Sequence, residues 1–332
     1  MVFNNLDGET IKADRTVIPK GCLSFSEQAL YIAEASENEF NKLFESVGIE
    51  ELAVFESTGS EVIYEGAKLD EFKKKAVQFF KDLWAKIKRG YEMIVDKFNE
   101  VVNGAKKNFP KLSDSDLKRI KLEDTAKMGK VHEYDFGGTT PRENAHKLIM
   151  EINADFKSGK EDEDRTSLRD KYDDKIVSQI SGTDKTSIKE AKDALKKKYI
   201  GDEKDVDFGW AKKNFDYIKM HTFEAPRKEI KASFNDEKAI IDDAMNEVKK
   251  FKETDVDYAK TTISLMKDVC NTLHQCMAVQ MDALKHRHSE CRNIYTKLYV
   301  ASQKAVKESA TVQNESTIIA TQQDLVDKSF DW

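Results

Sequence analysis

Apolar residues recur every three or four positions along much of the chain, and this spacing predicts amphipathic α-helices. The pattern is clearest over residues 68–103, and it ends near Gly104 and Pro110. A second long series follows Thr254 and continues to about Glu308. As one continuous helix this series would span roughly 80 Å at about 1.5 Å per residue, so it needs packing partners along most of its length.

Shorter elements are expected around these two helices. The pattern predicts helices at Ser26–Gly48, in a short stretch from Ser113, from Pro141 to Phe156, at Ser187–Tyr199 and at Arg227–Lys252. Alternating residues and a glycine pair predict a small β element near residues 130–138. Residues 157–175 have the composition of a charged connector, and residues 309–332 that of a polar tail.

The scarcity of helix-breaking residues supports this reading of the pattern. Glycine and proline together occupy 18 of 332 positions, where average usage predicts about 40. That deficit disfavours many-turned β folds and glycine-rich nucleotide-binding folds, while 35% charged and 39% hydrophobic residues are typical of long amphipathic helices. The fold class expected is mainly α: an elongated helical bundle with a long C-terminal helix and a small β element.

Charge is distributed unevenly along the chain, and it suggests three segments. Residues 1–66 carry 4 basic and 13 acidic side chains, a net charge of −9, although the whole chain carries −6. We therefore expect an acidic N-terminal leader at 1–66, a helical domain at 67–226 and a long-helix domain at 227–332. The start of the chain lacks the pattern of a secretory signal, and no stretch is apolar enough to predict a membrane span.

Cysteine and histidine residues gather on the second long helix, at Cys270, His274, Cys276, His286, His288 and Cys291. Thiolate and imidazole ligands suit zinc, but the pairs 270/274 and 288/291 would lie about 20 Å apart on one helix. The same positions form an apolar stripe with Met277 and Met281, so we interpret them as core residues and expect no metal site. Together with Cys22, the cysteines are expected to be reduced thiols.

Catalytic motifs are missing from the sequence. It contains no GxSxG, HExxH or CxxC pattern, and the segment from Gly182 to Ser187 lacks the glycine that a P-loop requires before its lysine. We therefore expect no enzyme, no catalytic residues and no cofactor.

The first long helix carries a basic face beside its aromatic residues. Between Lys68 and Arg89 its net charge is about +5, as expected for a helix that contacts DNA backbone or a membrane surface. A solvated lysine face over a packed core would have the same sequence. The candidate contact residues are Lys73, Lys74, Lys75, Lys81, Lys86, Lys88 and Arg89.

Two short segments resemble sites cut by the maturation proteases of large tailed bacteriophages, in which an aliphatic residue, any residue and Glu precede a small residue. The segments are Ile32-Ala33-Glu34-Ala35 and Ile63-Tyr64-Glu65-Gly66. Residues 30–100 also resemble the N-terminal parts of virion structural and internal head proteins of such phages. Glu34 is expected inside a helix, and Glu65 in a loop before a helix start.

This resemblance implies a non-enzymatic structural and assembly protein of a tailed-phage virion, internal to the head or associated with capsid or portal. Its partners would be other virion proteins of the capsid, portal or core, packaged DNA and further copies of itself. It would be located in the virion, and in the host cytoplasm during assembly. Cleavage after Glu65 would discard the leader and change the net charge to +3, which favours contact with DNA.

An alternative function follows from the basic helix alone. The protein could be a cellular helical protein that binds a membrane surface or nucleic acid through Lys68–Arg89. Both hypotheses assign the chain to binding rather than catalysis.

Overall fold

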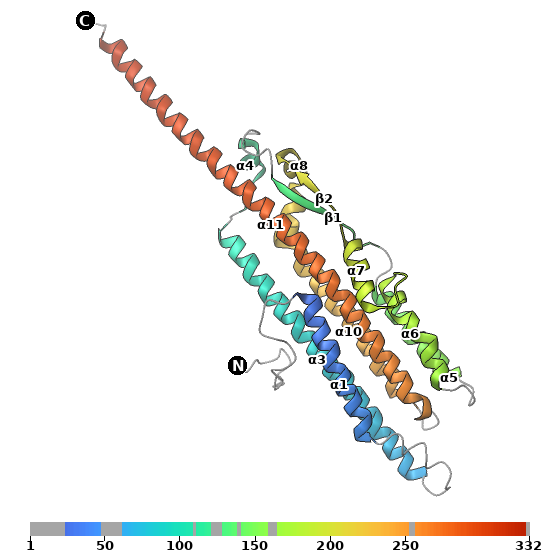
Figure 1. Cartoon of the computed structure of the whole chain (residues 1–332). Coiled ribbons are helices and arrows are strands. Elements are labelled where there is room, and N and C mark those ends of the chain that lie inside the picture. Colours follow the sequence, from blue (N-terminus) through green and yellow to red (C-terminus); the bar gives the residue numbers. More distant parts are fainter. Residues whose placement is uncertain are drawn as a thin grey trace. The chain divides into compact units, whose positions relative to one another are not determined.

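The computed structural model describes residues 24–47, 62–108, 111–120, 128–137, 141–158, 165–251 and 256–329. Within these residues the chain forms ten α-helices and one two-stranded antiparallel sheet (Figure 1). The longest helix, α11, spans Val256–Ser329 and has 74 residues. The predicted mainly helical class, long C-terminal helix and small β element are therefore confirmed.

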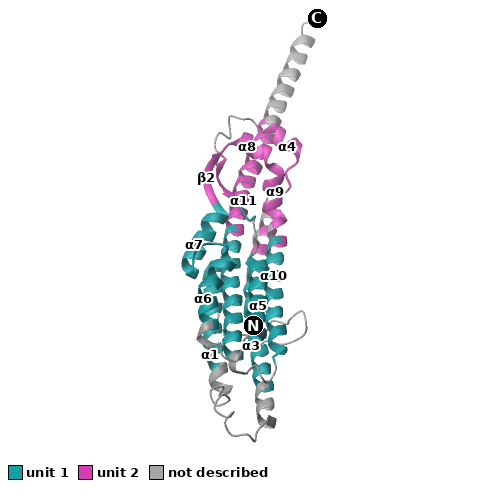
Figure 2. Ribbon diagram, turned by 90° about the vertical axis from the view of Figure 1, so that its right-hand side faces the viewer, with its two compact units in different colours: residues 1–96, 134–200, 229–283 teal, residues 97–133, 201–228, 284–332 magenta. Residues whose placement is uncertain are grey.

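The chain divides into two compact units, each assembled from three separate segments (Figure 2). The first unit holds residues 1–96, 134–200 and 229–283, and the second holds residues 97–133, 201–228 and 284–332. The sequential segments expected from charge have boundaries at residues 66 and 226, and these fall inside α3 (Val62–Asn108) and α10 (Ala225–Lys249). A continuous helix provides no linker at either point, so the units do not coincide with those segments.

The core of the first unit forms where the apolar faces of its helices meet. On α3 the predicted face is buried, since Phe72, Phe80, Leu83 and Ile87 are at most 1% exposed. Helix α1 (Phe25–Val47) packs against this face, with the rings of Phe40 and Phe79 5.5 Å apart. Ring contacts also join α10 to α3, where Phe234 lies 4.7 Å from Trp84 and 5.5 Å from Tyr91.

Three shorter helices complete the first unit. They are α5 (Pro141–Ser158), α6 (Arg165–Ser181) and α7 (Ile188–Tyr199). Helix α5 buries Leu148, Ile149 and Ile152 completely. Its Arg142 pairs with Asp236 of α10 at 2.8 Å, so polar contacts accompany the apolar ones at its surface.

The second unit combines short helices with the sheet. Its elements are α4 (Asp114–Arg119), β1 (Gly129–Tyr134), β2 (Ile200–Val206), α8 (Phe208–Lys213) and α9 (Phe215–Phe223). Backbone hydrogen bonds from Met128 to Val206 (2.8 Å) and from Asp135 to Tyr199 (3.3 Å) set the antiparallel register. These elements share one apolar cluster with the α11 residues Cys291, Ile294, Tyr295 and Leu298.

Several predicted boundaries are wrong, and α6 shows why. Residues 165–175 belong to a helix rather than to a charged connector. Charged residues dominate the segment, but Leu168, Tyr172, Ile176 and Ile180 recur every four positions and are buried. A single apolar residue per turn is enough when neighbouring helices cover it, so composition alone was misleading. Residues 159–164 lie outside the described residues.

Strand β2 and the ends of two helices also differ from expectation. Residues 200–206 were not predicted as a strand, because the sequence IGDEKDV is polar and its five central residues are exposed. Helix α3 begins at Val62 rather than near residue 68. The predicted polar tail, from residue 309, continues the backbone of α11 as far as Ser329.

The fold predicts that substitutions at Phe80 and at its neighbour Lys81 have very different effects on the free energy of unfolding. Replacing the fully buried Phe80 with alanine should lower the free energy of unfolding by about 3–5 kcal/mol, because it leaves a cavity in the first unit. Lys81 is exposed, so Lys81→Ala should change the same quantity by less than about 0.5 kcal/mol. Urea denaturation followed by circular dichroism checks both values, and equal effects would contradict this packing.

Candidate functional sites

The seven basic residues proposed to contact DNA or membrane all lie on α3, and the structure pairs several of them. Lys73 and Asp70 are 3.7 Å apart, Lys75 and Glu71 2.9 Å, and Lys88 and Glu92 4.0 Å. Lys86 pairs with Glu39 of α1. Lys74 and Lys81 are exposed, whereas the side chains of Lys73, Lys75, Lys86, Lys88 and Arg89 are half-buried. Much of this positive charge is therefore neutralised within the first unit.

Electrostatics on α3 agree with this pairing. The hydrogen bond and the charge of Lys75 lower the pKa of Glu71, so this carboxylate keeps its charge beside the lysines.

No helix in the described part of the chain combines the length and apolar composition needed to cross a membrane.

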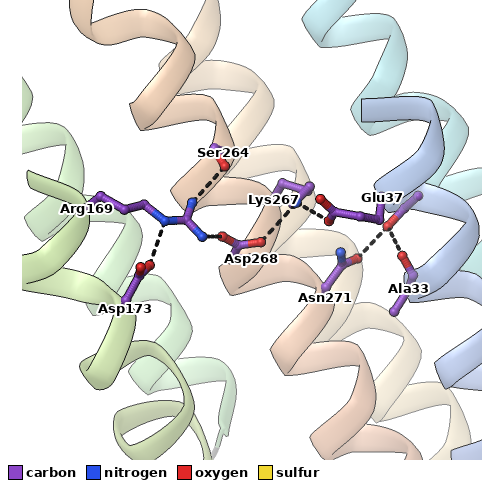
Figure 3. Close-up of polar contacts among 9 residues, drawn as sticks. Ala33, Glu37, Arg169, Asp173, Ser264, Lys267, Asp268 and Asn271 are labelled. Atoms are coloured by element: carbon purple, nitrogen blue, oxygen red, sulfur yellow. Dashed lines mark hydrogen bonds and ion pairs between the residues drawn. The ribbon is translucent and has the colours of Figure 1, made fainter. Parts of the chain in front are cut away.

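Helix α1 is joined to α11 by a charged network that continues to α6 (Figure 3). Lys267 of α11 is 3% exposed, pairs with Glu37 of α1 and lies 3.1 Å from Asp268. Asp268 in turn pairs with Arg169 of α6 at 2.7 Å. Burial raises the pKa of Asp268, whereas the charges of Lys267 and Arg169 act in the opposite direction. Removing one member would leave buried charge without its partner, so the network holds the three helices in register.

A carboxylate of α11 binds the N-terminus of α1. Asp282 accepts hydrogen bonds from the backbone N–H of Phe25 (2.9 Å) and of Ser26 (3.1 Å), and from the Ser26 hydroxyl (2.7 Å). A negative charge is favourable there because the first N–H groups of a helix have no partner within the helix. Ten residues further along α1, the Ser36 hydroxyl donates a hydrogen bond to Asn271 of α11 at 3.1 Å. Polar contacts thus hold α1 at two points along α11.

Both proposed cleavage sites lie in helices. Glu34 is exposed and Ala35 half-buried on α1, as expected for the first segment. Glu65 and Gly66 were expected in a loop, and this placement is wrong because α3 already begins at Val62. Whether either site is cut stays a prediction.

The cysteine and histidine residues of α11 fall into separate groups with different surroundings. In the first unit His274 Nδ1 lies 2.8 Å from Glu237 Oε2, and Glu237 Oε1 accepts a hydrogen bond from Tyr91 at 2.7 Å. Burial and the nearby Glu237 raise the pKa of Tyr91. Burial also raises the pKa of the Cys270 thiol, and that of Cys276 to about 12. Protonated thiols are poor ligands and poor nucleophiles.

In the second unit His288 and Cys291 belong to the packed interior. His288 Nδ1 lies 2.9 Å from the His221 carbonyl oxygen, to which it donates, and its ring contacts Phe98. Burial raises the pKa of Cys291 to about 12. Burial and the positive charges of Arg287 and His288 lower the pKa of His221 to about 4. His221 is therefore neutral near pH 7.

His286 has different neighbours from the rest of the stripe. Glu290, one turn later on α11, lies 3.5 Å from its Nδ1, and His132 of β1 lies 2.6 Å from the same carboxylate oxygen. Sequence reasoning missed His132 and Glu290. The spacing of His286 and Glu290 by four residues was visible in the sequence, but His132 is brought to them only by the tertiary fold.

A pocket of about 530 Å³ also lies in the second unit. Lys106, Lys111 and Lys219 line it together with Asp216, Met220, Phe223 and Glu224. Because both signs of charge are present, the lining does not favour one class of ligand.

In the comparisons with known proteins, no family model matches the chain, and no curated protein or solved structure matches it.

The contact of Asp282 with the N-terminus of α1 predicts the effect of removing this carboxylate on stability and on amide exchange in α1. Asp282→Ala removes the partner of the first N–H groups of α1, so the free energy of unfolding should fall by about 1–2 kcal/mol, and amide exchange in α1 should accelerate. Asp242→Ala is a matched control, because Asp242 pairs at the surface with Lys238 of the same helix and its loss should cost below about 0.5 kcal/mol. Unchanged exchange in α1 after Asp282→Ala would contradict the contact.

The low pKa of His221 predicts a dependence of stability on pH. Between the ordinary value of 6.5 and about 4, the unfolded chain takes up a proton that the folded chain does not. Stability should therefore fall as the pH is lowered through this range. Urea denaturation at several pH values should show a smaller slope for His221→Gln than for the unchanged chain. Met220→Leu, at the exposed neighbouring residue, should keep the full slope; an unchanged slope in His221→Gln would refute the assignment.

Proposed function

We propose that the protein is a non-enzymatic structural and assembly protein of a tailed-phage virion, inside the head or at the capsid or portal. The observation that carries this proposal is the use of buried and half-buried charged groups in the first unit. Lys267 and Asp282 join α1 to α11, and Glu237 joins α10 to α3 and α11. Groups held in this way by partners within the chain serve packing between helices, which is the activity expected of a scaffold.

The phage assignment itself is supported by the two segments that resemble maturation sites. Glu34 lies in the middle of α1, directly after the buried Ile32 and Ala33. Glu65 lies in the first turn of α3, and the ends of helices open more readily than their centres. We therefore favour Glu65 as the cleaved residue.

Cleavage after Glu65 would cut the covalent link between α1 and the rest of α3 without removing the contacts that hold α1. Release of the leader would then separate Glu37 from Lys267 and Glu39 from Lys86. The remaining chain would carry +3 instead of −6, Lys86 would lose Glu39, and Lys267 would keep only Asp268 as a partner. Such a change favours contact with densely packed DNA.

Mass spectrometry of the protein from purified particles tests the proposal. We expect the protein to be present and to begin at Gly66, whereas Glu65→Gln should remain full length. Glu61→Gln, four residues earlier, is the matched control and should be cut normally. Particles without the protein would overturn the virion role, and a full-length chain in mature particles would overturn the processing.

The alternative function is binding of a membrane surface or nucleic acid through Lys68–Arg89 in a cellular protein. Its support is the exposure of Lys74 and Lys81. The ion pairs of Lys73, Lys75, Lys86 and Lys88 oppose it, since paired lysines contribute less to the attraction of a polyanion. We therefore favour the structural role.

A further inference from the structure

Three side chains in the second unit place nitrogen and oxygen donors close together. His132 comes from β1, and His286 and Glu290 lie one turn apart on α11. One donor atom from each side chain lies within 4.8 Å of the donor atoms of the other two. The two imidazole rings meet edge to face, with centroids 5.0 Å apart.

We propose that His132, His286 and Glu290 bind a divalent transition-metal ion, with Zn²⁺ as the best fit. Two imidazoles and one carboxylate are a ligand set that zinc uses with a fourth position open to water or another ligand. Calcium and magnesium prefer sets made of oxygen alone, so the two imidazoles disfavour them. This proposal is independent of the phage assignment.

The distances fit such an ion after small rotations of the side chains. Ligands about 2.0–2.1 Å from a tetrahedral zinc ion lie roughly 3.3 Å from one another. In the structure His132 Nδ1 is 2.6 Å and His286 Nδ1 is 3.5 Å from Glu290 Oε1. These values lie on either side of the required spacing, and the donor atoms of the two imidazoles lie within 4.8 Å of each other.

The second oxygen of Glu290 is already oriented by the strand. Glu290 Oε2 accepts a hydrogen bond of 3.1 Å from the backbone N–H of His132. Hydrogen bonds of this kind fix metal-binding carboxylates from behind and leave the other oxygen for the ion. Side-chain exposure increases from 13% for Glu290 through 22% for His132 to 46% for His286, so the ion would enter from the His286 side.

A neighbouring acidic residue is not counted among the ligands. Glu203 of β2 pairs with Lys130 of β1 at 2.6 Å. Its carboxylate is therefore engaged elsewhere on the sheet, and the fourth position is left to solvent. Bound metal would connect β1 directly to α11 and stabilise the second unit.

Titration calorimetry of the tag-free full chain with Zn²⁺ tests the site. We expect one ion per chain, and Co²⁺ should give the visible absorption of tetrahedral coordination at the same stoichiometry. Glu290→Gln and His286→Gln should each weaken Zn²⁺ binding at least tenfold, as should His132→Gln. Amide exchange in β1 should slow when Zn²⁺ is added to the unchanged chain.

His146→Gln is the matched control, because His146 and Asp243 form a histidine–carboxylate pair at 2.8 Å in the first unit. Its affinity for Zn²⁺ should equal that of the unchanged chain. Absence of Zn²⁺ binding, or binding that persists undiminished in Glu290→Gln and His286→Gln, would overturn the proposal and leave a histidine–glutamate hydrogen bond. His286 is half exposed, so we expect His286→Gln to fold. This variant therefore tests the site even if His132→Gln fails to fold.

Discussion

A helix that is buried around its whole circumference requires other elements on every side of it. Helix α11 meets this condition over residues 269–279, all of which are buried. In the first unit α1, α6 and α10 each make a polar contact with this helix, through Asn271, Asp268 and His274 respectively. In the second unit, taken by itself, α11 contributes Cys291, Ile294, Tyr295 and Leu298 to the common cluster. The stability of each unit therefore depends on its own part of one helix.

Polar residues on a buried helix explain which neighbour occupies which side. Apolar contacts are not directional, so Leu, Ile and Met side chains would accept several arrangements of the surrounding helices. Lys267 and Asp268 accept few, because Lys267 must meet Glu37 of α1 and Asp268 must meet Arg169 of α6. A misplaced helix would leave a buried charge or amide without a partner, at a cost of several kcal/mol for a charge. The charged network thus contributes more to the choice of arrangement than to net stability.

Helix α1 lies in the segment expected as an acidic leader, yet it is a packed part of the first unit. Residues 24–47 are part of the first unit, where Ala29, Ile32 and Phe40 are buried. Removal of this helix would expose apolar surface on α3 and α11 as well as two lysines. A processed chain would then need a new partner for this surface, which links the proposed cleavage to assembly rather than to charge alone.

Local periodicity was enough to predict the class of fold, the course of α3 and α11, and helix α7, because a helix is defined by contacts between residues three and four positions apart. It was not enough for α6, where charge obscured one apolar residue per turn, or for β2, whose polar sequence becomes a strand by pairing with β1. The basic face of α3 and its carboxylates at three- and four-residue spacing were visible in the sequence, but the pairing of Lys86 with Glu39 of α1 was not. The cluster of His132 with Glu290 joins residues 158 positions apart. Sequence alone determined which segments become helices, since that depends on near neighbours; tertiary structure decided which polar groups meet, since that depends on how distant segments pack.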